Sequence, residues 1–171
     1  MARFRRRTCV ALAGVLLCTR AGVALAGEKG GTGFFLIVAQ GPSVAGLPKP
    51  TESQHVVAYD SKFLREAEPT LYLLLPKTPD VPLILAKAPD LQEKGESGFP
   101  ELHVELTPEA ARQLEKLSRE HLGERVAFVI GGEPVTIHRI RSVISDGKFR
   151  LSRCTDKACQ YIYGRLTTSR P

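Results

Sequence analysis

Residues 101–152 read ELHVELTPEAARQLEKLSREHLGERVAFVIGGEPVTIHRIRSVISDGKFRLS, and the order of patterns in this stretch decides the fold. It opens with Leu102, Val104 and Leu106 alternating with polar residues, which is the period of a half-buried strand. Thr107 then offers its hydroxyl as a helix N-cap, and Pro108 suits the first helical position, where no backbone N–H is needed. The stretch therefore predicts a strand that leads directly into a helix.

The predicted helix carries one apolar stripe and ends at a stop signal. Ala110, Leu114 and Leu117 recur at helical spacing, while the positions on the opposite face are charged. The pattern continues to about Leu122, and Gly123 stands where a left-handed residue ends a helix. We therefore expect this helix to pack its apolar face on a sheet.

Two hairpin signals follow the helix. Residues 125–130 form a short apolar strand, and Gly131-Gly132 supplies the positive backbone angles of a tight turn. Residues 134–144 then change their apolar parity midway, which predicts a β-bulge near His138-Arg139. Asp146-Gly147 predicts a second hairpin before a last strand over residues 149–151.

This order of strand, capped helix, strand, Gly turn and strand-turn-strand resembles the head part of the first periplasmic domain of SecD, the accessory subunit of the bacterial protein-export machinery. The resemblance covers roughly residues 99–166 and rests on the run Leu106-Thr107-Pro108-Glu109, the helix ending at Gly123 and the apolar strand after it. It implies an α+β fold, with a mainly antiparallel sheet, a central helix packed on it and additional N-terminal strands. We assign residues 99–168 to this β-α-β-β-β-α core.

The first 26 residues have the layout of a cleaved secretory signal. MARFRRR is a basic start, an apolar run extends from Thr8 to Cys18, and Ala24-Leu25-Ala26 is a small-x-small cleavage pattern. The apolar run is too short for a membrane span. We therefore expect cleavage near Ala26, no transmembrane segment in the mature chain, and a periplasmic or secreted location.

The formal charge of +6 is carried mainly by that signal. Residues 1–26 contain five arginines and no acidic residue, so that removing them from +6 leaves +1 for the mature chain. A charge of this size gives no reason to expect a nucleic-acid partner.

The cysteines divide between the signal and the C-terminal segment. Cys9 and Cys18 belong to the signal, which leaves Cys154 and Cys159 in an oxidising compartment, where a pair forms a disulfide. If Thr155 caps a last helix, these two cysteines occupy the positions that a hydrophobic staple joins. The alternative interpretation is a redox or metal pair.

The region between the signal and the core is less regular. Residues 27–54 read as a flexible lead, one strand and a Pro/Gly-rich connection, and residues 55–98 as N-terminal strands followed by a mobile loop. Strand candidates cover residues 34–39, 55–58, 70–75 and 82–86. The polar run of residues 90–98 is the expected mobile loop.

Motifs of catalysis and metal binding are missing from the sequence. The four histidines, His55, His103, His121 and His138, are far apart and lack the spacing of metal ligands, so we expect no metal, no cofactor and no enzymatic activity.

One group of charged residues does suggest a binding site. Arg139, Arg141, Arg150 and Arg153 are expected to form a basic cluster on adjacent strands. This cluster is either a solvated sheet face guarded against aggregation or a site for an anionic partner.

Three functions remain open at the level of sequence. The resemblance implies an exported, non-catalytic binding module that engages translocated polypeptides or an envelope protein partner, through apolar surface and open sheet edges. The second is a small envelope enzyme, which predicts a pocket gathering His103, His121 or His138 with carboxylates. The third is a relative in fold alone, with an unrelated target.

Overall fold

The structure is a computed structural model that describes residues 31–60, 69–95, 98–152 and 156–168. It is an α+β fold of small antiparallel sheets and two helices, as the sequence predicts. In chain order the elements are β1 (Gly33–Leu36), β2 (Ala39–Gly41), a 3-10 turn (Val44–Gly46), β3 (Gln54–Tyr59), β4 (Leu71–Pro76), β5 (Val81–Pro82), β6 (Asp90–Gln92), β7 (Glu101–Glu105), α1 (Pro108–Glu120), β8 (Arg125–Ile130), β9 (Glu133–Arg139), β10 (Lys148–Leu151) and α2 (Asp156–Thr168). The predicted β-α-β-β-β-α order is therefore present from β7 to α2.

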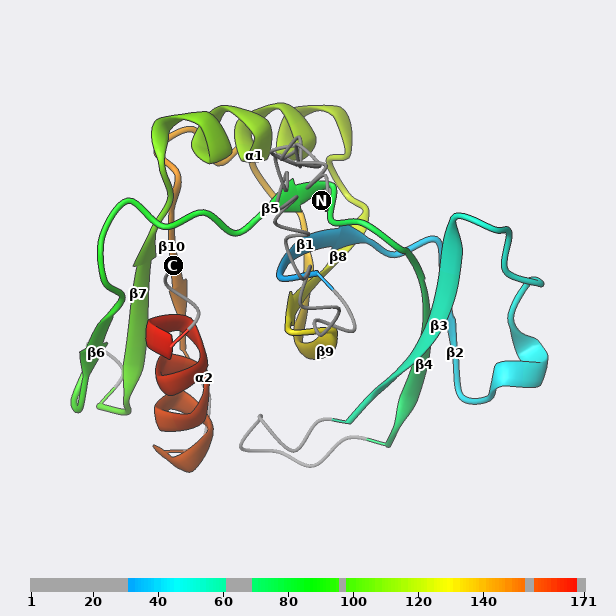
Figure 1. The fold of residues 1–171 in the computed structure, drawn as a ribbon, viewed down its shortest axis with the longest axis horizontal. Coiled ribbons are helices and arrows are strands. Elements are labelled where there is room, and N and C mark those ends of the chain that lie inside the picture. Colours follow the sequence, from blue (N-terminus) through cyan, green and yellow to red (C-terminus); the bar gives the residue numbers. More distant parts are fainter. Residues whose placement is uncertain (1–30, 61–68, 96–97, 153–155, 169–171) are drawn as a thin grey trace, which may run out of the picture.

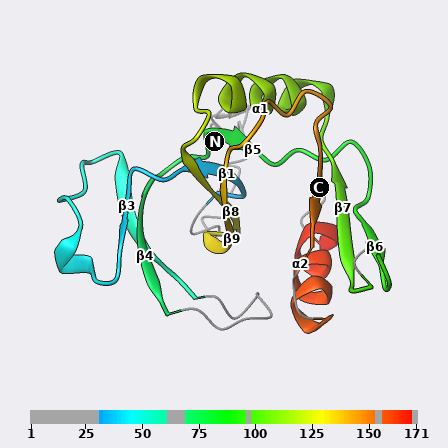
Figure 2. The ribbon, with the colours of Figure 1, turned by 180° about the vertical axis from the view of Figure 1, so that it is seen from behind.

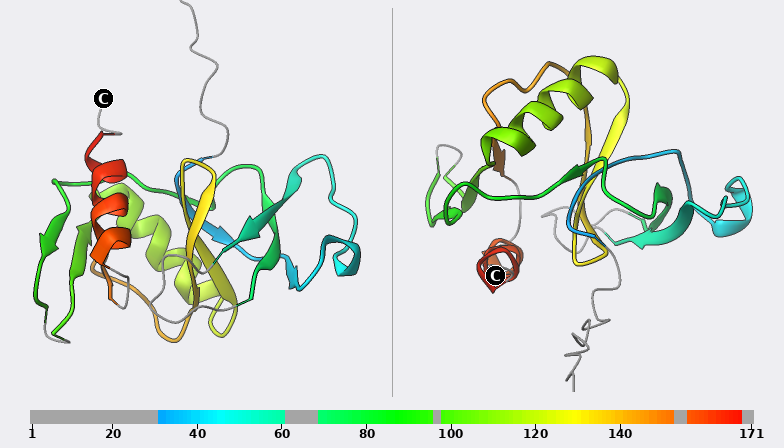
Figure 3. Two further views of the ribbon diagram at one scale, coloured as in Figure 1. Left: turned by 90° about the horizontal axis from the view of Figure 1, so that it is seen from below. Right: turned by 45° about the horizontal axis from the view of Figure 1, so that its top comes forward.

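The strands form three separate sheets that lie in a row (Figures 1 and 2). Their orders are β5-β1-β8-β9, β10-β7-β6 and β2-β4-β3. Helix α1 lies across the top of the first two sheets, and α2 stands beside β7 and β10 (Figures 1 and 3). The strands from β7 to β10 consequently do not form one continuous sheet, because β8 and β9 pair in one sheet while β7 and β10 pair in another.

Strand β1 connects the N-terminal region to the C-terminal core. It lies between β5 and β8, with Phe34 opposite Phe128 and Phe35 opposite Ala127. Alternation along these strands then places Phe34 and Phe128 in one apolar cluster and Phe35 and Ala127 in another. The four-stranded sheet is thus buried on both faces: one faces the helices and the β10-β7-β6 sheet, and the other faces β3 and β4.

Helix α1 forms as its sequence pattern predicts. The Thr107 hydroxyl accepts a hydrogen bond from the Ala110 N–H at 3.5 Å, and Ala110, Leu114 and Leu117 are buried. The helix ends at Glu120, and Gly123 has the positive φ of 87° expected beyond a helix C-terminus.

The predicted β-bulge is present at a different position. The register of β8 and β9 shifts between Phe128 and Val129, opposite Val135, and not at His138-Arg139. Near the predicted position β9 ends at Arg139, so the change of parity marks the end of a strand.

The second predicted hairpin, at Asp146-Gly147, is also wrong. Residues 140–147 pack along α1 and deliver β10 to β7 instead of returning it to β9. Gly147 has a φ of 63°, and a Cβ there would lie 2.4 Å from the Cβ of Ala111. This glycine is therefore required by a close approach to the helix and not by a two-residue turn.

The expected mobile loop begins as a strand. Asp90, Leu91 and Gln92 pair with His103, Leu102 and Glu101 of β7. The apolar Leu91, between Asp90 and Gln92, packs against the core, which explains why the segment joins the sheet.

Helix α2 also packs against the core. Ala158, Cys159, Ile162 and Leu166 are buried, and the helix contacts β6, β7 and β8. The Tyr161 hydroxyl donates to a Glu133 carboxylate oxygen at 3.1 Å, which joins α2 to the start of β9. Neither of the two helices has the length and apolar content needed to cross a membrane, judged over the described residues.

Candidate binding cavity between two sheets

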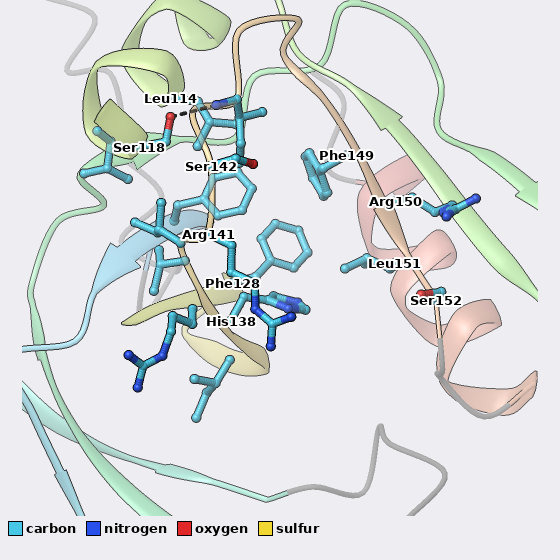
Figure 4. Close-up of a pocket in the computed structure, with 17 residues that line it drawn as sticks. Leu114, Ser118, Phe128, His138, Arg141, Ser142, Phe149, Arg150, Leu151 and Ser152 are labelled. Carbon is cyan, nitrogen blue, oxygen red and sulfur yellow. Dashed lines mark hydrogen bonds between the residues drawn. The ribbon is translucent and has the colours of Figure 1, made fainter. Parts of the chain in front are cut away.

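A cavity of about 640 Å³ lies between the four-stranded sheet and the β10-β7-β6 sheet (Figure 4). Its volume falls in the range of small-ligand and side-chain binding sites. Helix α1, the end of β9, the connection after β9 and strand β10 all contribute to its wall. The lining residues are Phe34, Leu114, Leu117, Ser118, Val126, Phe128, Ile137, His138, Arg139, Ile140, Arg141, Ser142, Ile144, Phe149, Arg150, Leu151 and Ser152.

Three aromatic rings form the floor of the cavity. The ring centroids of Phe34 and Phe128 are 5.2 Å apart, those of Phe34 and Phe149 are 5.1 Å apart, and those of Phe128 and Phe149 are 5.4 Å apart. The rings are tilted or edge-on, which is the favourable arrangement for aromatic pairs. This floor can accept an apolar side chain.

Ser118 of α1 holds the connection between β9 and β10. Its hydroxyl accepts a hydrogen bond from the Ile144 N–H at 2.9 Å and donates to the Glu115 carbonyl at 3.0 Å. Ser118 is 1% exposed, so both bonds are shielded from water. They position residues 140–147 as one wall of the cavity.

The cavity is flanked by terminal strands of two sheets. Strand β9 ends the four-stranded sheet and β10 ends the three-stranded one. Just past the end of β9, the Ile140 N–H donates to the Glu124 carbonyl at 2.9 Å, which makes Glu124 and Ile140 a hydrogen-bonded pair. Because such pairs alternate in an antiparallel ladder, the backbone groups of Ile137 and Arg139 point away from β8.

The outward direction of these groups has independent support from β8. Arg125 lies opposite Arg139, and its carbonyl accepts from the Ile37 N–H on the other side of β8, at 3.0 Å. Within the described residues no hydrogen bond occupies the N–H of Ile137 or of Arg139. Strand β9 therefore presents an open edge at the cavity.

The arginines of the predicted cluster do not lie on adjacent strands, because β9 and β10 belong to different sheets, although Arg139, Arg141 and Arg150 all line the cavity. Arg139 shares a sheet face with its partner Arg125, whereas Arg141 lies beyond the end of β9. Arg150 points away from the cavity, toward β7 (Figure 4). Arg153 lies outside the described residues.

Arg150 is held by a buried carboxylate. Glu101 is 1% exposed, and its Oε2 lies 3.4 Å from Nη1 of Arg150 and 3.5 Å from Nε2 of His103. Arg150 thus lines the cavity from β10, while its guanidinium forms an ion pair with Glu101 on the opposite face of that sheet.

The arginines at the end of β9 have different surroundings. Neither Arg139 nor Arg141 forms an ion pair with any described residue, and no Asp or Glu is among the residues that line the cavity. Arg141 and His138 reach toward the space between β9 and β10 (Figure 4). The mouth of the cavity is consequently positive.

The histidines lie at separate places in the fold. His138 lines the cavity, His103 adjoins Glu101, His121 is bonded to Glu124 at the end of α1, and His55 is on β3. Loss of surrounding water lowers the pKa of His138, whose Nε2 lies 2.9 Å from the Thr136 hydroxyl. The described residues contain no group of His, Cys, Asp and Glu suited to hold a metal ion.

The cysteine pair is described only in part. Cys159 is fully buried on α2, with its Sγ 3.7 Å from the Pro100 carbonyl, whereas Cys154 lies outside the described residues. The disulfide between them therefore stays a prediction.

The cavity floor could not be found from the sequence. Its rings come from β1, β8 and β10, which are far apart in the chain, and no local pattern connects them. The signal that does exist is the phase of each strand: Phe34, Phe128 and Phe149 all stand at inward positions.

Sequence comparison and structural comparison give different results for this chain. No model of a known protein family matches the sequence, and no curated protein matches it. Solved structures of SecDF do match the fold. One, of a SecDF that enhances protein export, shares 26% identity over 48% of this chain and 37% of that chain, with a TM-score of 0.43. Another, SecDF from Thermus thermophilus, a translocon-associated membrane protein, shares 12% identity over 84% of this chain and 30% of that chain, with a TM-score of 0.44.

The match that bears on the fold is SecDF in its super-membrane-facing form. It has a TM-score of 0.50 and 21% identity, and covers 82% of this chain but only 18% of that chain. This chain therefore spans less than half the length of each of these SecDF chains. The likeness establishes a SecD-like fold, and the assignment to the head part of the first periplasmic domain remains a prediction.

Proposed function

We propose that this protein is a non-catalytic binding module of protein export, which takes an extended polypeptide segment into the cavity between β9 and β10. The observation that carries the proposal is the apolar floor of Phe34, Phe128 and Phe149 beside the open edge of β9. An extended segment can pair with such an edge through its backbone while alternate side chains enter the cavity.

The connection to export is supported by the SecD-like fold and by the secretory signal predicted for residues 1–26. Binding through backbone hydrogen bonds and an apolar floor is tolerant of sequence, which suits a partner that meets many exported chains. An exported location and the identity of the bound chains are part of the proposal.

Peptide binding tests the cavity directly. Fluorescence anisotropy with labelled extended peptides is compared between the purified protein and Ser142→Trp, because Ser142 is an exposed residue of the cavity wall (Figure 4). The matched control is Ser145→Trp, an exposed residue of the same connection that does not line the cavity. We expect Ser142→Trp to abolish binding and Ser145→Trp to retain it. Equal binding by the two variants would exclude the cavity as the site.

The role in export needs a separate measurement in cells. A photoreactive residue at position 142 is compared with one at Gln92, which lies on β6 and outside the cavity lining. Capture of several different exported precursors from position 142 alone would support the proposal. Capture of one folded envelope protein, or the same products from both positions, would contradict it.

A further inference from the structure

Six arginines among the described residues fall into two groups. Arg112, Arg119 and Arg150 each form an ion pair with a glutamate, namely Glu109, Glu115 and Glu101. Three others, Arg125, Arg139 and Arg141, form no ion pair with any described residue, and they lie at the start of β8, at the end of β9 and just past that end. We name Arg125, Arg139 and Arg141 the arginine strip.

Two members of the arginine strip are direct cross-strand partners. Arg125 and Arg139 oppose each other in a non-hydrogen-bonded pair, the position at which side chains on neighbouring strands come closest. Like charges in this arrangement repel. The side-chain hydrogen bond of Arg125 is to the neutral Gln40 Oε1, at 3.0 Å, so no described residue offsets the repulsion of this pair.

The third member completes the strip on the cavity side. Arg141 lines the cavity next to the edge of β9, and its side chain reaches toward the space that a bound segment would occupy (Figure 4). A segment that pairs with β9 would therefore meet positive charge on both of its faces: Arg125 and Arg139 on one, and Arg141 on the other.

Because the side chains of a strand alternate between two faces, this arrangement of charges favours a particular sequence pattern in the bound segment. Alternate side chains of a strand point to opposite faces of the sheet. In a segment added to β9, residues on the face of His138 would enter the cavity and meet its phenylalanine floor, and the residues between them would lie beside Arg139.

From this geometry we infer that the cavity selects extended segments in which apolar residues alternate with acidic ones, the apolar side chains filling the floor and the carboxylates pairing with Arg125 and Arg139 of the arginine strip. The inference rests on the function proposed above and names its substrate class. The carboxylates are those of internal Asp or Glu side chains, because the open edge of β9 extends past the cavity and does not close around a chain end.

Four acetylated and amidated peptides test the preference by anisotropy. In the first, Val alternates with Glu; in the second and third, Gln or Lys replaces Glu; the fourth has the composition of the first with its valines and glutamates in two blocks. We expect the alternating Val/Glu peptide to bind about threefold to tenfold more tightly than the Gln peptide, and the difference to shrink in high salt. The Lys and block peptides are expected to bind most weakly.

Protein variants assign the preference to the arginine strip. Arg139→Gln should remove most of the advantage of the Glu peptide over the Gln peptide, and Arg141→Gln, on the cavity face, should remove less of it. Lys116→Gln, which removes one positive charge from an exposed position on α1, should leave it unchanged. Circular dichroism verifies that all three variants are folded.

The outcomes separate this inference from the proposed function. If the Gln peptide binds as tightly as the Glu peptide, or if Arg139→Gln retains the preference, the acidic substrate class is wrong although the cavity still binds peptides. If the Gln peptide made with a free C-terminal carboxylate binds as tightly as the amidated Glu peptide, the inference is also wrong. If no peptide binds at all, the proposed function itself fails.

Discussion

Because Arg125 and Arg139 lie opposite each other, we predict that reversing one of these two charges stabilises the unliganded protein. Two guanidinium groups about 7 Å apart in surroundings close to water repel by about 0.6 kcal/mol. In Arg139→Glu this repulsion is replaced by an attraction of similar size. After the entropy of holding two exposed side chains is subtracted, a gain of about 0.5–1 kcal/mol remains.

Thermal and urea unfolding measure the gain. For a chain of this size we expect the midpoint temperature to rise by about 2 °C, and Arg139→Gln to give about half of that rise. Since the Debye length falls to about 3 Å at 1 M salt, the difference between Arg139→Glu and the parent protein should nearly disappear there.

A double-mutant cycle identifies the partner. Arg125→Glu alone should also stabilise, although it loses the hydrogen bond to Gln40, whereas the double variant again carries like charges. We expect the two gains to be non-additive by about 1–2 kcal/mol. Additive effects, or a destabilising Arg139→Glu, would refute the reasoning that these two charges face each other without compensation. The same variant must bind the alternating acidic peptide more weakly, so stability and binding should move in opposite directions.

Further predictions concern the backbone, one titrating group and the cysteines. Gly147→Ala should destabilise by about 1–3 kcal/mol in urea unfolding, because the new Cβ collides with α1 and the φ is positive. Gly164→Ala should instead stabilise by about 0.5–1 kcal/mol, since this helical position has open space for a Cβ. Burial lowers the pKa of His55 in the folded state, so the stability of the fold should be greatest above the ordinary pKa of 6.5 and should decrease as the pH falls below it. His55→Gln should weaken this pH dependence of the stability. Thiol titration of the unfolded, unreduced mature protein should find no free thiol if Cys154 and Cys159 are paired, and one free thiol per cysteine would contradict the pairing.

The parts of the fold that the sequence predicts are those that depend on neighbours in the chain. Helix α1 follows from its cap, its stripe and its terminal glycine, all within residues 107–123. The tight turn at Gly131-Gly132 is confirmed for the same reason, with φ values of 57° and 81°. In both cases the residues whose sequence predicts the conformation are the same residues that adopt it.

The parts that the sequence does not predict depend on pairings across long stretches of chain. Nothing in residues 33–36 specifies that β1 must pair with β8, about 90 residues later. The arginines predicted on adjacent strands lie on strands of different sheets, and whether β9 pairs with β10 cannot be read from either strand alone. Arg125, which proves to lie opposite Arg139, was not singled out, because its position depends on the register of β8 and β9.

The open edge of β9 follows from the contacts that hold residues 140–147. A direct hairpin between β9 and β10 would pair the two strands and leave no room for a segment. Instead, the hydroxyl of Ser118 accepts a hydrogen bond from the Ile144 N–H, and Gly147 packs against Ala111, so the chain runs along α1 before β10 begins. The Leu106 N–H then donates to the Gly147 carbonyl at 3.0 Å and sets the register of β10 on β7. The contacts that separate the two strands therefore also create the site between them.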